Sequence, residues 1–174
     1  HETITNAAKT SEGHDYTKLI SPQLQKSFQK ADLRFCNQEA VSAGSLPVSG
    51  YPTFNAPTAF PRDLNSFGCN LISTANNHAA DQGLEGIRGT LEAWDTQKPL
   101  AVSGSYRNAQ EAEKLNVIEK NNIKVGFTAF NEVNNINPQV SPIGIHMLSD
   151  TQSLEQQIKG LKEKLENLNI KRQE

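Results

Sequence analysis

The residues best placed to do chemistry are Asn76, Asn77 and His78, with Asp81 a few positions further on. An apolar run over residues 71–75 precedes them, which is typical of a buried strand, and a glycine and a helical pattern follow. Polar groups at the end of such a strand lie at the carboxyl edge of a sheet, where open α/β folds bind ligands. An amide oxygen beside an imidazole nitrogen suits a divalent metal ion or an ester oxygen.

A simpler interpretation of the same stretch is a turn. Asn and Asp side chains bond to their own backbone and tolerate left-handed conformations, so Asn76, Asn77 and Asp81 can all be turn formers. His78 would then be an ordinary, partly buried ring. The short motif by itself favours this interpretation, so a chemical role depends on what the rest of the chain supplies.

A second informative stretch covers residues 32–41. Phe35 and the apolar residues around it suit a mostly buried strand, and Asn37 and Glu39 follow at its end. A buried, unpaired carboxylate is costly, so Glu39 is either solvated or serves a cation. Taken alone, this stretch favours the solvated carboxylate.

The order of apolar patterns predicts an α/β fold with at least one antiparallel hairpin. Ser21 and Pro22 indicate the start of a helix. Asn121 and Asn122 indicate a hairpin turn. Trp94 lies on the apolar stripe of a predicted helix. The predicted helices cover residues 22–30, 61–67, 83–98 and 150–171, and the predicted strands cover residues 33–36, 69–74, 99–103, 115–119 and 124–130.

The length of the chain fits one domain over residues 1–174. Within it we expect a loose N-terminal arm over residues 1–14 and a C-terminal helix over residues 150–171.

The formal net charge of -2 leaves no basic excess, which argues against a nucleic-acid surface. The apolar runs are too short for a transmembrane helix. His1 is not a natural initiator, so we expect a processed or excised piece of a longer protein.

The two cysteines, Cys36 and Cys69, each fall in an apolar, strand-like run. Free buried thiols behave as small hydrophobic side chains, and we favour that state over a disulfide. A bridge remains geometrically possible if the two residues lie on adjacent strands.

Several motifs together resemble one family, the CapA-type poly-gamma-glutamate capsule biosynthesis proteins. The matching segments occur in the family's order over about residues 15–133, which makes the set more specific than any single motif. Residues 31–33 and 37–39 resemble its "aDl…NxE" signature, residues 51–57 (YPTFNAP) resemble its "fnap" run, and residues 75–83 (ANNHAADQG) resemble its "aNNHalDyG" signature.

The resemblance implies the calcineurin-like metallophosphoesterase superfamily, with a layered α/β/β/α sandwich that is incomplete in this chain. Divalent metal ions are the implied cofactors, with Asn77, Glu39 and Asn37 as their ligands. Two such ions about 3.5–4 Å apart activate a hydroxide and bind the oxyanions of a displacement. His78 is implied as a general acid or phosphate-oxygen partner, and Asp81 as the residue that orients it.

The chain also departs from the family pattern. The family's first Gly-Asp strand, its "HWG" histidine and its "GHxH" pair have no counterpart here, and His1, His14 and His146 lie in no matching context. Because affinity for hard cations depends on ligand number and charge, we do not expect tight dinuclear binding by this chain alone.

Three hypotheses for function follow from these observations. The first is part of a capsule or cell-surface polymer synthesis protein, whose parent is a metal-dependent phosphoesterase or hydrolase acting on a phosphoester or on the gamma-glutamyl polymer. Under this hypothesis we expect this chain alone to lack a complete site and to be inactive or impaired. The second is a non-catalytic scaffold that binds the polymer or an assembly partner. The third is a site completed by another chain in a homo-oligomer. The resemblance implies an extracytoplasmic place at the cell surface, within a membrane-associated capsule synthesis complex.

Overall fold

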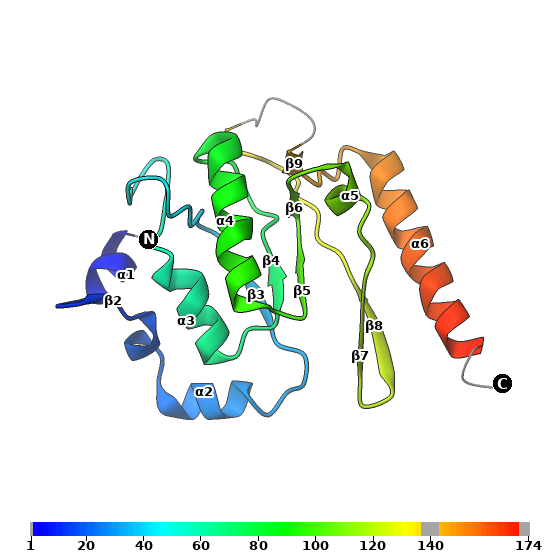
Figure 1. Cartoon of the computed structure of the whole chain (residues 1–174), viewed down its shortest axis with the longest axis horizontal. Helices are drawn as coiled ribbons and strands as arrows, with labels where there is room; N and C mark the ends of the chain where they lie inside the picture. The colour runs from blue at the N-terminus through cyan, green and yellow to red at the C-terminus, as the bar shows by residue number, and fades with distance from the viewer. Residues whose placement is uncertain (1, 137–142, 171–174) are drawn as a thin grey trace.

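The computed structural model describes residues 2–136 and 143–170 of the chain. These residues form successive layers of helix, sheet, sheet and helix, which run across Figure 1 from α3 and α4 to α6. The predicted α/β class is confirmed. Residues 1, 137–142 and 171–174 lie outside the described part. The last position of the helix predicted over residues 150–171 is therefore also outside it.

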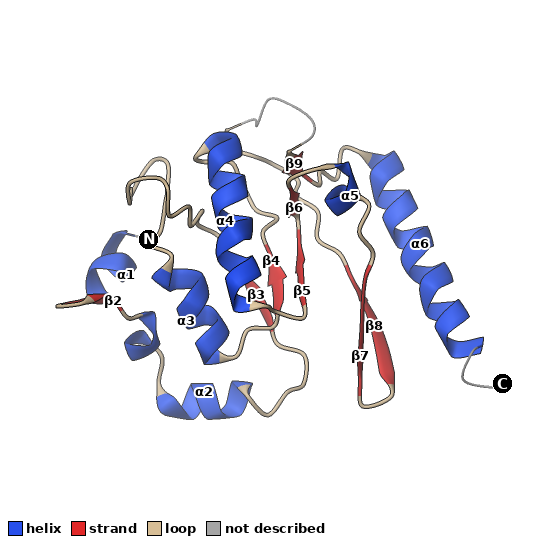
Figure 2. Cartoon of the chain, in the orientation of Figure 1, coloured by secondary structure: helices blue, strands red, loops and turns tan. Residues whose placement is uncertain are grey.

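Figure 2 shows the helices and strands by type. The helices are α1 (Glu2–Ala7), the 3-10 helix η1 (Tyr16–Leu19), α2 (Pro22–Phe28), α3 (Ala59–Phe67), α4 (Gly83–Gln97), α5 (Ala109–Ala112) and α6 (Thr151–Ile170). The strands are β1 (Lys9–Thr10), β2 (Gly13–His14), β3 (Phe35–Asn37), β4 (Leu71–Ser73), β5 (Ala101–Ser103), β6 (Ser105–Tyr106), β7 (Asn116–Lys120), β8 (Ile123–Phe127) and β9 (Gly144–Ile145).

The central sheet is parallel, with its strands in the order β3-β4-β5. Strand β4 takes the middle position because its Leu-Ile-Ser run is buried throughout, and Ile72 has no exposed surface. Because all three strands run the same way, their last residues, Asn37, Ser73 and Ser103, are paired across the sheet at one edge. That edge carries the candidate site.

One face of this sheet is covered by α3 and α4. Ile72 packs there with Phe67, Cys69 and Trp94. Trp94 is fully buried, as its place on the apolar stripe predicted, and its indole N–H donates to the Oε1 atom of Gln38. Helix α3 ends at Phe67 and is capped by Gly68, whose φ of 122° suits a residue without a side chain.

The other face of the sheet is covered by the β7–β8 hairpin. Leu71, Ala101 and Ile118 form a second apolar cluster there, with Leu33 and Phe127 packed against it. Helix α6 then covers the outer side of the hairpin, where the backbone of Gly126 faces Leu161. Successive side chains of the hairpin therefore point alternately toward the central sheet and toward α6, as the two-residue period of a strand requires.

Local sequence signals account for the ends of several elements. The hydroxyl of Ser21 accepts the N–H of Leu24 and caps α2, which begins at Pro22. Asn121 and Asn122 both have positive φ, 50° and 65°, as a tight turn between β7 and β8 requires. These predictions from the sequence are confirmed.

The segment expected to be a loose arm is ordered instead. It forms α1 and the antiparallel β1–β2 pair. The hydroxyls of Thr5 and Tyr16 lie 3.1 Å apart in a buried contact, and Ala8 is 1% exposed. The polar composition predicted a solvated arm, but a few small side chains are enough to pack this segment against Tyr16 of η1.

The expected burial of Phe35 is wrong, since its side chain is 56% exposed. Strand β3 is an edge strand, with β4 on one side only. Phe35 contacts Phe127 of the hairpin edge-on, with ring centroids 6.2 Å apart. The sequence pattern indicated a strand here and could not indicate its place at the edge.

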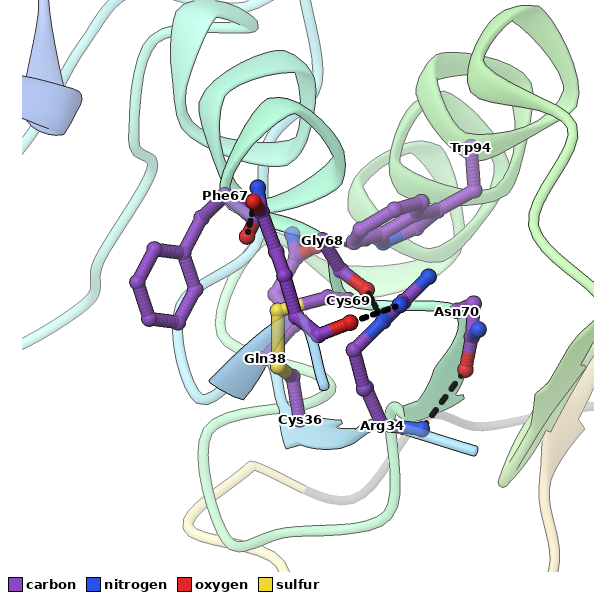
Figure 3. The surroundings of a disulfide bond; sticks show 9 residues. Arg34, Cys36, Gln38, Phe67, Gly68, Cys69, Asn70 and Trp94 are labelled. Atoms are coloured by element: carbon purple, nitrogen blue, oxygen red, sulfur yellow. Dashed lines mark hydrogen bonds between the residues drawn. A yellow bond between two sulfur atoms is a disulfide. The ribbon is translucent and has the colours of Figure 1, made fainter. Parts of the chain in front are cut away.

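The expectation of free thiols is also wrong, because Cys36 and Cys69 form a disulfide. Cys69 precedes β4, next to β3, and the two Cα atoms are 5.7 Å apart, within the usual range for a bridge. Figure 3 shows the bridge, with Phe67 and Trp94 among the residues drawn around it. Arg34 lies nearby and donates to the backbone oxygen of Gly68.

Candidate functional site

The Asn-Asn-His motif lies just past the end of β4, at the carboxyl edge of the sheet. Asn76 acts as the turn former that its residue type suggested, because its Oδ1 accepts the N–H of His78 at 3.0 Å. Its Nδ2 donates to the backbone oxygen of Gln38 at 2.8 Å and contacts Oδ1 of Asn37 at 3.4 Å. The turn is therefore fixed to the end of β3.

Strand β5 approaches this turn closely through Gly104. The φ of Gly104 is 121°, and a Cβ atom there would lie 2.5 Å from the backbone nitrogen of Ala75. A side chain at this position is excluded by the backbone. The glycine thus allows the ends of β4 and β5 to meet directly behind the motif.

His78 is held by Asp81, whose Oδ2 lies 2.8 Å from the Nδ1 atom of the ring. The side chain of Asp81 has no exposed surface, whereas that of His78 is 14% exposed. Phe54 supports both residues: its backbone N–H donates to Oδ2 of Asp81 at 2.8 Å, and its ring lies 4.6 Å from the imidazole, centroid to centroid. Among the described residues, the Nε2 atom of His78 forms no hydrogen bond.

Phe54 is positioned by the long loop that the sequence left irregular. Asn55, which is fully buried, accepts the N–H of Ala43 at 2.8 Å and donates to the oxygens of Ala43 and Pro47 at 3.1 and 3.0 Å. Gln82 donates to Ser49 Oγ at 3.1 Å. One buried amide thus closes the loop on itself and brings its aromatic ring against His78.

A second segment reaches the motif from residues 131–135, and sequence analysis did not predict it. The Nδ2 of Asn131 donates to the backbone oxygen of Asn76 at 2.8 Å. The backbone N–H of Asn135 donates to the oxygen of Asn77 at 2.9 Å. Asn77 Nδ2 lies 3.3 Å from Asn135 Oδ1, and Asn135 Nδ2 lies 3.2 Å from Nδ1 of His78. A run of asparagines in a loop carries no spacing signal for such a contact.

The structure brings together His78 and Asp81 as expected. Among the described residues, no hydrogen bond joins Asn77 to the other two expected metal ligands, Asn37 and Glu39. Glu39 and Asn37 are exposed, and Asn37 contacts Asn76 rather than Asn77. Over residues 2–136 and 143–170, no group of three or more His, Cys, Asp or Glu side chains is arranged to hold a metal ion. Glu39 is the one carboxylate among the three expected ligands, which gives too little negative charge for two divalent cations. These residues do not fit a dinuclear centre.

Comparison with known proteins gives one family. The model of the bacterial capsule synthesis protein PGA_cap matches residues 1–172, almost the whole chain. This match confirms the family resemblance found in the motifs. No curated protein matches the chain.

Proposed function

Because the chain belongs to the bacterial capsule synthesis family PGA_cap, we propose that it contributes a proton-transfer site to the synthesis or processing of a capsular polymer. The substrate class is a gamma-glutamyl bond of the polymer or a phosphoester of a cell-surface polymer. One observation carries the proposal: His78 is fixed through Nδ1 by the buried carboxylate of Asp81, and Nε2 has no partner among the described residues.

The arrangement suits general acid–base chemistry at one atom. Asp81 fixes the ring plane and stabilises a proton on Nδ1, and the ring of Phe54 limits water on one side of the imidazole. A carboxylate that orients a histidine in this way keeps the outer nitrogen available. Nε2 is therefore the atom that takes a proton from, or gives one to, a bound substrate.

Metal dependence stays a prediction from the family. The side chains of Asn37, Asn77 and Glu39 would be the ligands contributed by this chain, and in the described ranges no hydrogen bond joins Asn77 to the other two. No step of the proposed chemistry is therefore assigned to a metal ion. Titration of the protein with Mn²⁺ or Zn²⁺ by calorimetry tests this point. Stoichiometric binding that is lost in Glu39→Gln would support the family prediction.

The asparagine contacts favour a second candidate, a non-catalytic binding domain. Asn76, Asn77, Asn131 and Asn135 are tied to one another around the motif, and amide groups recognise polar polymers without reacting with them. In that case His78 would act as a hydrogen-bonding group only. A site completed by a second copy of the chain is a further variant of this proposal.

The disulfide supports an extracytoplasmic location at the cell surface. Disulfides persist in oxidising compartments and are rare in the cytosol. The Cys36–Cys69 bridge is consistent with the location that the capsule synthesis family suggests. No helix in the described ranges has the length and apolar character to cross a membrane. We propose association with a membrane-bound capsule synthesis complex as the cellular setting.

The test compares the purified chain with His78→Ala on two substrates, poly-gamma-glutamate and an activated phosphodiester, by product mass and chromophore release. We expect His78→Ala to lower the rate by about 10²–10⁴-fold on the substrate that the protein accepts. His14→Ala, a histidine on β2, is the control and should keep the rate. Polymer binding without turnover in both proteins would support the binding domain, and neither binding nor turnover would contradict both candidates.

A further inference from the structure

Asn135 touches both side chains that the motif presents, although it is far away in the chain. Its Oδ1 atom lies 3.3 Å from Nδ2 of Asn77, and its Nδ2 atom lies 3.2 Å from Nδ1 of His78. Its backbone N–H donates to the oxygen of Asn77 at 2.9 Å. The two side-chain contacts place one amide group between Asn77 and His78.

The segment that carries Asn135 is fixed independently of these contacts. Asn131 is 6% exposed, and its Nδ2 donates to the backbone oxygens of Asn76 and Val133 at 2.8 and 2.7 Å. Its backbone N–H donates to the oxygen of His146 at 2.7 Å. The start of the segment is therefore held by the buried side chain of Asn131, four residues before Asn135, which is itself exposed.

The contacts of Asn135 determine which atoms Asn77 and His78 leave available. Because Asn77 turns its Nδ2 toward Asn135, its Oδ1 is the group left as an acceptor, and in the described ranges Oδ1 has no hydrogen-bond partner. His78 uses Nδ1 toward Asn135 and Asp81, which leaves Nε2 available. One carbonyl oxygen and one ring nitrogen are thus presented together.

The two partners of His78 Nδ1 require different positions of the ring proton. A side-chain NH₂ only donates, so the contact with Asn135 needs a lone pair on Nδ1 and places the proton on Nε2. The contact with the carboxylate of Asp81 needs the proton on Nδ1 and leaves a lone pair on Nε2. The outer nitrogen is a donor in the first arrangement and an acceptor in the second, and a group that both gives and takes a proton uses both.

We propose that Asn135 is a positioning residue of this site, which orients the amide of Asn77 and competes with Asp81 for Nδ1 of His78. The inference rests on the proposed role of His78 in proton transfer. It adds a residue from a distant loop that selects the donor form of Nε2, whereas Asp81 selects the acceptor form.

The test is nuclear magnetic resonance of the ¹⁵N-labelled chain at a fixed pH of about 8, with the ring nitrogens of His78 and the side-chain amide of Asn77 as reporters. In Asn135→Ala the proton should shift from Nε2 toward Nδ1 by about fivefold in tautomer ratio, as expected for one lost hydrogen bond of about 1 kcal/mol. The Asn77 amide signals should lose their protection from exchange. Asn135→Asp should keep that protection, because a carboxylate still accepts from Asn77, while the proton moves to Nδ1.

Asn134→Ala is the matched control, since Asn134 contacts Asn131 and Met147 but not His78. It should leave both reporters unchanged. If Asn135→Ala and Asn135→Asp leave the His78 ring signals as in the unmodified chain, the inference is wrong. If Asn134→Ala shifts them equally, the effect is a general loosening of the loop, which also contradicts it. Both readouts are independent of turnover, so they separate this inference from a failure of the proposed reaction.

Discussion

The Nδ1 atom of His78 lies 2.8 Å from Oδ2 of Asp81, within one turn of the chain, and the same oxygen accepts the backbone N–H of Phe54. One buried carboxylate oxygen therefore holds both the imidazole and the loop that packs on it. Its other oxygen, Oδ1, is buried with no hydrogen-bond partner among the described residues. A buried carboxylate oxygen without a partner is costly, so this pair carries a local cost in stability.

Replacing Asp81 should show how much its hydrogen bond to Phe54 contributes to stability. We expect Asp81→Ala to lower the free energy of unfolding by about 1–3 kcal/mol, because the N–H of Phe54 loses the partly buried hydrogen bond to Oδ2 of Asp81. Asp81→Asn keeps an acceptor for Phe54 and should cost less stability than Asp81→Ala. Urea unfolding measures both. Equal stability of the two variants would show that the bond to Phe54 contributes nothing.

The family resemblance implied this pair, because both partners lie in the motif that matches the family's "aNNHalDyG" signature. The sequence did not predict Phe54, Asn131 or Asn135 as neighbours, because their contacts depend on how two long irregular segments close over the sheet edge. Local patterns also predicted the α/β class and the main helices. They failed for Phe35 and for the disulfide, where the outcome depends on which strand lies at the edge and which residues become adjacent.

Reduction of the disulfide should destabilise the protein by about 3–4 kcal/mol. Cys36 and Cys69 are separated by 33 positions, and a closed loop of that length lowers the entropy of the unfolded chain by the corresponding amount. Urea unfolding with and without reductant measures the effect, with full reduction verified by mass. The Cys36→Ser/Cys69→Ser double variant should be as unstable as the reduced protein and insensitive to reductant. Reductant sensitivity in that variant would point to another cause.

Two helical glycines should respond oppositely to alanine. At Gly89 in α4 a Cβ atom would lie 2.5 Å from Cβ and 2.8 Å from Cα of Ala43, so Gly89→Ala should lower the free energy of unfolding by about 1–3 kcal/mol. At Gly160 in α6 a Cβ atom would meet the flexible end of Leu115 at 2.8 Å. Gly160→Ala should be neutral or stabilising by up to about 1 kcal/mol, from helix propensity.

Thermal or urea unfolding of the two glycine variants tests this contrast. Gly89→Ala should also disturb the loop that begins at Ala43 and ends near Phe54, which hydrogen exchange of that loop can detect. If Gly89→Ala is as stable as the unmodified chain, α4 and the loop are less closely packed than their backbone contact indicates.

His146 should make stability depend on pH through its burial. Its ring is packed between Tyr106 and Phe130, with centroids 4.9 and 5.0 Å away, and it is 7% exposed. Burial lowers the pKa of His146 below its usual value of 6.5, while the negative charge of Asp150 acts in the opposite direction. Below about pH 6.5 the unfolded chain binds a proton that the folded chain does not. The stabilising contribution is therefore complete above that pH and is lost as the pH falls toward the folded-state pKa.

The measurement is the free energy of unfolding in urea, at about pH 5 and about pH 7.5, for the unmodified chain and for His146→Phe. Phenylalanine keeps a ring between Tyr106 and Phe130 but cannot bind a proton, so the variant should lose less stability on acidification than the unmodified chain.

Asp150→Asn removes the charge that favours the imidazolium and still caps α6, because Asn accepts the N–H of Ser153 as Asp does. It should lower the pKa of His146 further and increase the loss of stability in acid. If His146→Phe and the unmodified chain lose the same stability between the two pH values, His146 does not take up its proton on unfolding, and the acid sensitivity has to be assigned to the carboxylates.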